Sequence, residues 1–217
     1  SLTTVDDGTG SLSGNVTLDD GSLLTFSEIE SIICFGAGTR IATARGSRCV
    51  EDLQVGDMVV TRDHGLQPIR WIGTRKVPAK GDFAPIRIRP GVLKGQENDI
   101  VVSPQHRMLF QGYRSQLLFG ESEVLVAAKH LVDGVDVTVE QQAEITYVHI
   151  LFDMHEIIFA EGAAPESFHP GEVGLCAVHG AAREELFALF PDLRGMPSTY
   201  GGTARRCLKK HEALLLE

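Results

Sequence analysis

The chain has 217 residues, of which 43% are hydrophobic and 23% charged, a composition that supports one domain with its own buried core. Its formal net charge of −9 argues against a surface that follows nucleic-acid phosphates, so we expect no nucleic-acid partner. No apolar run approaches the ~20 residues of a membrane-spanning helix, and residues 1–7 show no signal-peptide pattern. We therefore expect a globular protein, acting as a monomer, without a membrane span.

The four cysteines are the next informative feature. Cys34, Cys49, Cys176 and Cys207 show no C-x-x-C spacing, which argues against a zinc site or a redox motif, so we expect no cofactor. Four cysteines are also too few for a disulfide scaffold. Cys34 stands apart because an acidic leader rich in Gly, Ser and Thr ends there and a series of short apolar runs begins. Cys176 and Cys207 are most simply small hydrophobic residues.

The leader, residues 1–33, contains one predicted hairpin. Residues 16–26 form two short apolar runs around Asp20-Gly21, a dipeptide typical of tight turns. Residues 27–30 have the pattern of a capping box for one helical turn. The alternative is a tethered flank with little fixed structure.

From residue 39 onward the sequence predicts many short strands. The expected strands are 40–43, 47–50, 58–61, 68–72, 85–89, 99–102, 108–110, 123–126, 135–139, 145–152 and 157–159. Runs this short, with no long helical pattern between them, favour a mainly β fold. Residues 53–59 and 131–137 share an L-x-x-G spacing, which suggests an internally duplicated, pseudo-two-fold fold, although so short a match can arise by chance.

After residue 168 the pattern becomes helical. Residues 181–190 have apolar side chains at helical spacing and stop before Pro191. Residues 203–217 can form a second helix, one face of which would hold Ala204, Cys207, Leu208 and His211. We therefore expect residues 168–217 to be a small helical extension that packs on the β module.

Two segments downstream of Cys34 carry side chains that can act on a peptide bond. In the first, a strand runs into Ser103, Pro104 breaks it, and His106 follows. Residues three apart in a turn can face the same group, so a hydroxyl and an imidazole would meet there. The alternative interpretation is a capping serine and a surface histidine.

The second segment, residues 149–162, has polar side chains between two apolar runs. His149, Asp153 and His155 would share one face of an extended strand. Two histidines and a carboxylate on one face could also bind a metal ion. No fourth ligand presents itself in the sequence, so we expect no metal site.

Together these segments resemble the Hedgehog/intein (Hint) autoprocessing family. The stretches CFGAGTRIAT and VEDLQVGD, within residues 34–57, are similar to its N-terminal splicing block. Ser103-Pro104-Gln105-His106 is similar to its T-x-x-H block, and residues 147–162 resemble its C-terminal block, with His155 at the block histidine. The likeness is closest to bacterial intein-like domains of large secreted proteins. We therefore expect a host protein that is secreted or on the bacterial surface, with the cytoplasm as the alternative.

This resemblance implies a flat, horseshoe-like, pseudo-two-fold β fold at residues 34–167, with the Ile33–Cys34 bond in a central cleft. The implied reaction is an N→S acyl shift, in which the Cys34 thiol attacks the Ile33 carbonyl to give a thioester. His106 is the expected general acid for the departing nitrogen, and Ser103 would hold the amide or the oxyanion. His155, oriented by Asp153 or His149, is a further candidate helper. The substrate is the leader itself, and water, a thiol or an amine would accept the acyl group.

The chain also departs from the family pattern. Inteins that splice end in His-Asn, whereas Gly162 is followed by Ala163-Ala164 and no Asn, so full splicing is not expected. Hedgehog-type domains use an acidic residue before the T-x-x-H block, where Gly73-Thr74 stands here, so sterol transfer is not expected either. Two alternatives are a catalytically degenerate Hint scaffold that links or binds neighbouring domains, and a thiol hydrolase that acts in trans.

Overall fold

The structure is a computed structural model that describes residues 33–170, 178, 181–194 and 196–216, together with the backbone of three N-terminal strands. These strands are β1 (Leu2–Asp6), β2 (Leu12–Thr17) and β3 (Leu23–Phe26), which form an antiparallel sheet. β2 pairs with β3 from Thr17↔Leu23 onward, so the predicted hairpin forms. Its Asp20-Gly21 turn and the capping pattern at 27–30 lie outside the described residues.

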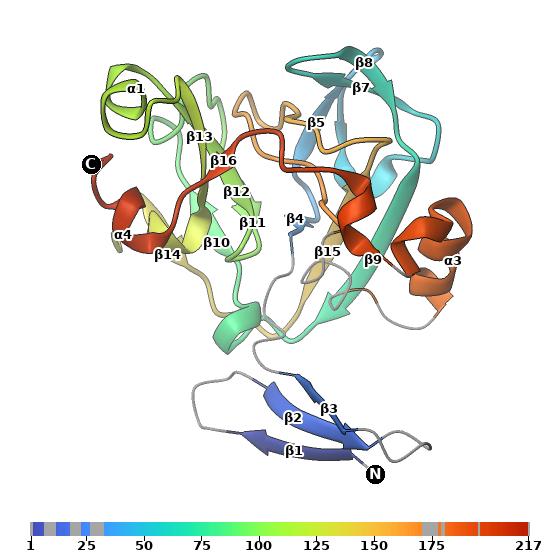
Figure 1. Cartoon of the computed structure of the whole chain (residues 1–217). Helices are drawn as coiled ribbons and strands as arrows, with labels where there is room; N and C mark the ends of the chain where they lie inside the picture. The colour runs from blue at the N-terminus through green and yellow to red at the C-terminus, as the bar shows by residue number, and fades with distance from the viewer. Residues whose placement is uncertain are drawn as a thin grey trace.

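The main body is β structure, as expected (Figure 1). Its strands are β4 (Phe35–Gly36), β5 (Arg40–Thr43), β6 (Gly46–Cys49), β7 (Met58–Thr61), β8 (Gly65–Pro68), β9 (Trp71–Val77), β10 (Ile86–Ile88), β11 (Ile100–Val102), β12 (Arg107–Gln111), β13 (Glu123–Ala127), β14 (Val137–Val139) and β15 (Ile145–Leu151). Short 3-10 helices η1 (Val50–Asp52), η2 (Gly81–Phe83) and η3 (Ala128–His130) and the α-helix α1 (Tyr113–Phe119) lie between strands. Helix α1 was not expected from the sequence.

One sheet places the residue that follows Cys34 at the centre of the molecule. Its strand order is β14-β10-β11-β4-β15-β9, and every pairing in it is antiparallel. Phe35 on β4 pairs with Val102 on one side and with Val148 on the other. The short strand β4 therefore holds the start of the domain between two longer chain segments.

The alternation of side chains along β15 decides what each face of this sheet contacts. Val148 and Ile150 point into the largest apolar cluster, which also holds Phe35. Tyr147 and Leu151 point to the other face, and Tyr147 joins the cluster that contains Cys34. His149 lies between these two residues in the sequence and shares their face. The sheet thus places His149 on the same face as Cys34.

The short L-x-x-G repeat corresponds to a structural repeat. η1 is followed by Gly56 and then by β7, and η3 is followed by Gly134 and then by β14. Both glycines have positive φ, +90° and +79°, a conformation that residues with a Cβ rarely adopt. The two units support the pseudo-two-fold fold that the sequence predicted.

Two strand predictions were wrong in detail. The expected strand 68–72 is divided, because β8 ends at Pro68 and β9 begins at Trp71. Between them Ile69 exchanges backbone hydrogen bonds with the 56–57 turn, and the N–H of Arg70 donates to Leu151. The expected strand 157–159 forms only isolated bridges, including Thr61↔Ile158.

The C-terminal extension is less helical than expected. It contains α3 (Ala181–Leu189), η4 (Pro191–Arg194), η5 (Pro197–Tyr200), β16 (Arg206–Cys207) and α4 (Lys210–Ala213). The predicted helix over 203–217 was wrong in its first half, because β16 pairs in parallel with β13. Figure 1 shows this segment, in red, crossing the front of the molecule between α4 and α3. No helix of the described residues could cross a membrane.

Candidate active site

Cys34 is fully buried, and its neighbours determine the state of its thiol. Its side chain belongs to a buried apolar cluster that also contains Tyr147, Val77 and Ala79. Burial raises the pKa of the Cys34 thiol well above its ordinary value, and the charge of Arg75 offsets this only in part. The resting side chain is therefore a protonated thiol that needs a base before it can act as a nucleophile.

The backbone around Cys34 is held on both sides by the 103–106 turn. The Cys34 N–H donates to Ser103 Oγ at 3.0 Å, and the Ser103 N–H donates to the Cys34 carbonyl at 3.0 Å. His106 Nδ1 lies 2.8 Å from the same carbonyl oxygen. This turn closes through a hydrogen bond from the His106 N–H to the Ser103 carbonyl. The structure thus brings Ser103 and His106 to Cys34, but His106 faces the Cys34 carbonyl and not its nitrogen.

Both ring nitrogens of His106 face carbonyl oxygens. Nδ1 lies 2.8 Å from Cys34 O, and Nε2 lies 2.9 Å from Glu166 O. A neutral imidazole has only one N–H, so it can donate to only one of these two acceptors. Burial lowers the pKa of His106, although the carboxylate of Glu166 and the two carbonyl contacts oppose this effect. At neutral pH one of the two contacts between His106 and a carbonyl oxygen therefore lacks a hydrogen-bond proton. Protonation of the ring would supply it, so that both nitrogens donate hydrogen bonds.

His149 contacts both the thiol and the carbonyl of the Ile33–Cys34 peptide bond. Its Nδ1 lies 2.9 Å from Ile33 O, and Cys34 Sγ lies 3.3 Å from both ring nitrogens. An atom equidistant from both nitrogens at this range must lie over the ring face, since an in-plane position would overlap ring atoms. Burial lowers the pKa of His149 to about 4, so the ring is neutral at pH 7. With Nδ1–H donating to Ile33 O, Nε2 remains a proton acceptor.

Aromatic side chains enclose His149. The ring of Phe168 meets it edge-on at 4.9 Å between centroids, and the indole of Trp71 lies at 6.2 Å. Trp71 is on β9, which pairs with β15 so that Gly73 lies opposite His149. A Cβ at Gly73 would come within 2.2 Å of the Trp71 ring, so only glycine leaves the indole its place. These groups exclude water from the imidazole.

The other two predicted residues lie away from Cys34. β15 ends at Leu151, so the extended strand that was to align His149, Asp153 and His155 does not continue that far. Asp153 is more than half exposed and pairs with Arg70 at 3.0 Å. His155 is buried, and its Nε2 lies 3.1 Å from a carboxylate oxygen of Glu166. The structure therefore connects His155 to Glu166 and leaves Asp153 at the surface.

Sequence reasoning missed Glu166, the buried partner of His155. Its carboxylate also accepts from the backbone N–H of Arg107 at 3.0 Å and from the Arg107 guanidinium at 3.1 Å. Burial alone would raise the pKa of Glu166, but the hydrogen bond from His155 and the charge of Arg107 lower it overall. The carboxylate therefore stays ionised. Its only sequence signal is an acidic residue in the middle of an apolar segment. Among the described residues, no group of three His, Cys, Asp or Glu could hold a metal ion.

Comparison with known proteins identifies the family. The family model of the Hint domain matches residues 33–172, about two thirds of the chain, so this chain belongs to the Hint domain family. The matched range begins at Ile33 and includes Ser103, His106 and His149. No curated protein sequence matches the chain.

Several solved structures are similar to this chain at low identity. A bacterial intein-like domain from Clostridium thermocellum shares 15% identity with a TM-score of 0.42, and the match covers 63% of this chain and 99% of that one. The MchDnaB-1 intein shares 14% identity with a TM-score of 0.40, covering 61% and 98%. The gp41-1 intein shares 13% identity with a TM-score of 0.38, covering 60% and 95%.

Proposed function

We propose that this Hint domain cleaves its own chain at the Ile33–Cys34 bond by an N→S acyl shift. The single observation that carries the proposal is the position of His149, which contacts both the sulfur of Cys34 and the oxygen of the carbonyl group whose carbon that sulfur would attack. An intramolecular nucleophile in the right geometry can gain the equivalent of about 7–11 kcal/mol of barrier lowering. The Cys34 thiol and the Ile33 carbonyl that precedes it are adjacent along the chain, so the attack is intramolecular.

The first step begins with proton transfer from Cys34 Sγ to Nε2 of His149, which requires the sulfur to move from the ring face to the Nε2 lone pair in the ring plane. Sγ then bonds to the Ile33 carbonyl carbon, and negative charge develops on the carbonyl oxygen. The Nδ1–H of His149 already points at this oxygen from 2.9 Å and stabilises the charge. One imidazole thus serves as base and as oxyanion donor.

The second step breaks the C–N bond. The Cys34 nitrogen leaves as an amine when it takes up the proton that the imidazolium of His149 carries, so the thiol proton ends on the nitrogen. Ser103 Oγ holds this nitrogen at 3.0 Å and His106 holds the Cys34 carbonyl at 2.8 Å, so the backbone of Cys34 is held on both sides of its Cα during the change. The product is a thioester between the Ile33 acyl group and Cys34 Sγ. Water, a thiol or an amine then takes the acyl group.

The test uses the full chain with a thiol or hydroxylamine and reads the intact mass over time. We expect the wild type to release residues 1–33, Cys34→Ala to release nothing, and Cys49→Ala, a control at a second described cysteine, to behave like wild type. Persistence of the full-length mass in the wild-type sample after prolonged treatment would rule the proposal out.

One alternative has a specific observation in its favour. Cys34 has no exposed surface and a raised thiol pKa, which would also suit a scaffold that has lost its chemistry. In that case Cys34→Ala and wild type would give the same mass spectrum, and the wild-type thiol would resist alkylation until the protein unfolds.

A further inference from the structure

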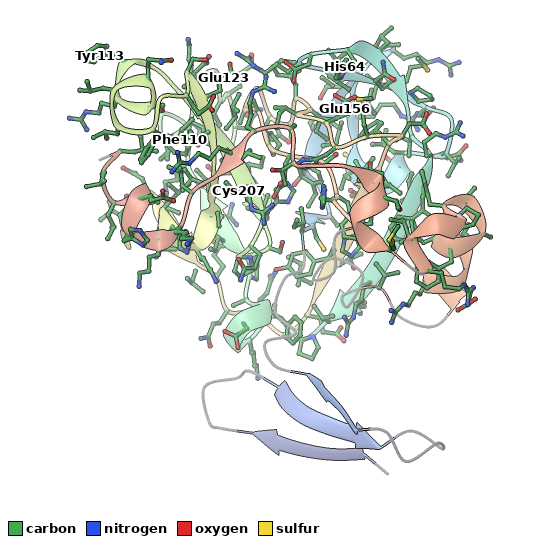
Figure 2. The ribbon with its side chains drawn as sticks, in the orientation of Figure 1. His64, Phe110, Tyr113, Glu123, Glu156 and Cys207 are labelled. Atoms are coloured by element: carbon green, nitrogen blue, oxygen red, sulfur yellow. The ribbon has the colours of Figure 1, made fainter. Side chains whose placement is uncertain are left out.

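The C-terminal extension reaches the buried network behind His106 through one short segment, residues 203–207, which we call the strap. Its two β16 residues, Arg206 and Cys207, pair with Val124 and Leu125 of β13. Figure 2 labels Cys207 on the strap and Glu123 at the start of β13. The strap is therefore an added edge strand on one half of the pseudo-two-fold fold.

Arg205 ties the strap to both halves of the fold. Its guanidinium donates to Asp63, in the turn between β7 and β8, at 2.7 Å, and to Glu123 on β13 at 2.7 Å. Asp63 follows the first repeat unit and Glu123 precedes the second, so one side chain spans the two. The neighbouring Arg206 pairs with Glu212 of α4 and contacts Phe119 O, which leaves it outside this connection.

Next to Arg205, the strap donates its Ala204 N–H to Nδ1 of His155 at 2.8 Å. This bond makes Nδ1 an acceptor, so a neutral His155 must carry its proton on Nε2. Nε2 lies 3.1 Å from the Glu166 carboxylate and 3.2 Å from Ser167 O, and both are acceptors. The strap therefore sets the tautomer in which His155 donates to Glu166.

Hydrogen bonds connect Glu166 to the reaction site. Its carboxylate is held by His155 and by two donors of Arg107, and its backbone N–H donates to Arg107 O at 3.0 Å. The carbonyl of the same residue is the one that His106 Nε2 contacts at 2.9 Å, and His106 in turn contacts the Cys34 carbonyl. A displaced carboxylate would move the peptide unit that supports the His106 ring.

We propose that Glu166 is a positioning residue for self-cleavage, and that docking of the strap controls it through the Ala204–His155–Glu166 chain of hydrogen bonds. The inference rests on the proposed function, because its effect is on Cys34-dependent release of the leader. It gives the buried His155–Glu166 pair a purpose. A buried carboxylate with polar partners costs desolvation energy, and apolar residues of the same volume could often replace such a group without loss of stability.

The first experiment compares single-turnover release of residues 1–33 from full-length variants. Ala204→Pro removes the strap N–H, whereas Ala204→Gly keeps it and loses only a methyl group. We expect Ala204→Pro and Glu166→Gln to release the leader at least about tenfold more slowly than wild type, and Ala204→Gly to stay close to wild type. Equal rates in folded Ala204→Pro, Glu166→Gln and wild-type chains would overturn the inference.

A second pair of variants covers the case in which Ala204→Pro does not fold. Arg205→Gln weakens the contacts of the strap with Asp63 and Glu123. Arg206→Gln also removes a positive charge from the strap but leaves these contacts intact. We expect slower release for Arg205→Gln only, and equal rates for the two would contradict control by the strap.

A spectroscopic readout separates this inference from the proposed function. In nitrogen-15 histidine spectra of wild type we expect the Nε2–H tautomer at His155, and in Arg205→Gln altered signals at both His155 and His106. The titratable groups near His155 and His106 that could also affect these signals are Glu166, Arg107 and His169. Failure of wild type to release its leader would reject the proposed function. Unchanged His106 signals would reject the coupling, whether or not release occurs.

Discussion

His149 has to stay uncharged in order to donate an N–H to Ile33 O and to keep a free lone pair on Nε2 beside the Cys34 thiol. The protein achieves this by burial among Trp71 and Phe168, which lowers the pKa of His149 to about 4. A buried neutral histidine also lowers the stability of the fold in acid, because the unfolded chain binds a proton at a pH where the folded chain does not. The same environment therefore links the chemistry to the stability of the fold.

This linkage predicts how stability depends on pH. The folded pKa of His149, about 4, lies below the value of about 6.5 for an unfolded chain. Its contribution is therefore complete above pH 6.5 and is lost as the pH falls toward 4. When the pH falls from 7 to 5, the titration of this residue should lower the free energy of unfolding by about 2 kcal/mol. Urea unfolding at both pH values should show a smaller acid loss for His149→Asn than for wild type, and equal losses would contradict the prediction.

The role of His106 can be tested by a matched pair of substitutions. If the ring only holds the Cys34 carbonyl, His106→Gln keeps a donor there and His106→Ala does not. We expect His106→Gln to release the leader within about tenfold of the wild-type rate, whereas loss of a general acid typically costs about 10²–10⁴-fold. Equal and large losses in both variants would show that proton donation by His106 is required.

The sequence predicted the residues that meet at Cys34 better than their roles. Spacing and family resemblance pointed to Ser103 and His106, and named His149 only as a residue that could orient His155. The structure brings Ser103 and His149 to the Ile33–Cys34 peptide and His106 to the next carbonyl, that of Cys34. Which nitrogen faces which oxygen depends on the register of β4 between β11 and β15, and no local pattern contains that information. Glu166 was missed for the same reason, since its partners come from distant segments.

At the scale of elements, β9 shows how one strand serves both packing and chemistry. Its residues 71 and 73 lie on one face, where the indole of Trp71 covers the space that a side chain at Gly73 would occupy. β9 makes its full seven-residue pairing with β15, the strand that carries His149. A change in β9 should therefore reach the site through the indole.

Gly73→Ala should be destabilising for this reason. Its Cβ would approach the Trp71 ring to 2.2 Å, and overpacking of this kind costs about 1–3 kcal/mol. Displacement of the indole should also slow leader release, because Trp71 is a neighbour of His149. Gly202→Ala is the matched control, since a Cβ there meets nothing within 4 Å. The stability of both variants can be measured by thermal or urea unfolding, and equal stability of the two would contradict the prediction.

Elements were predictable where a local signal decides them. Predicted strand 58–61 matches β7, and 40–43 matches β5, because turn residues bound each run closely. The 203–217 prediction failed because helical spacing of apolar side chains competes with docking on the open edge of β13, which only the folded protein offers. Helix α1 lacked a clear start signal, and its N-cap residue is Gly112.

At the scale of the whole molecule, the two repeat units do not form separate bodies. The six-stranded sheet contains β14 of the second unit together with β4, which precedes the first unit, and β9, which follows it. The largest apolar cluster likewise draws on both, from Val50 and Val59 to Ile88 and Val137. The internal repeat was visible in the sequence, but this interleaving was not.

Shared sheet and core predict a single cooperative unfolding unit. Hydrogen exchange under native conditions should give the same opening free energy for the most protected amides of β9 and of β13, although these strands lie in different sheets. Mass spectrometry of peptides that cover each strand can measure both at once. A gap of several kcal/mol between the two would show that one half opens without the other.

The position of Trp71, the only tryptophan in the chain, has one more consequence. An indole 6.2 Å from an imidazole loses fluorescence when that imidazole becomes positively charged, so the emission of this protein should dim in acid with the ionisation of its neighbour. The protein thus contains an intrinsic optical probe close to the Ile33–Cys34 bond, and the ionisation of His149 can be followed without any added dye.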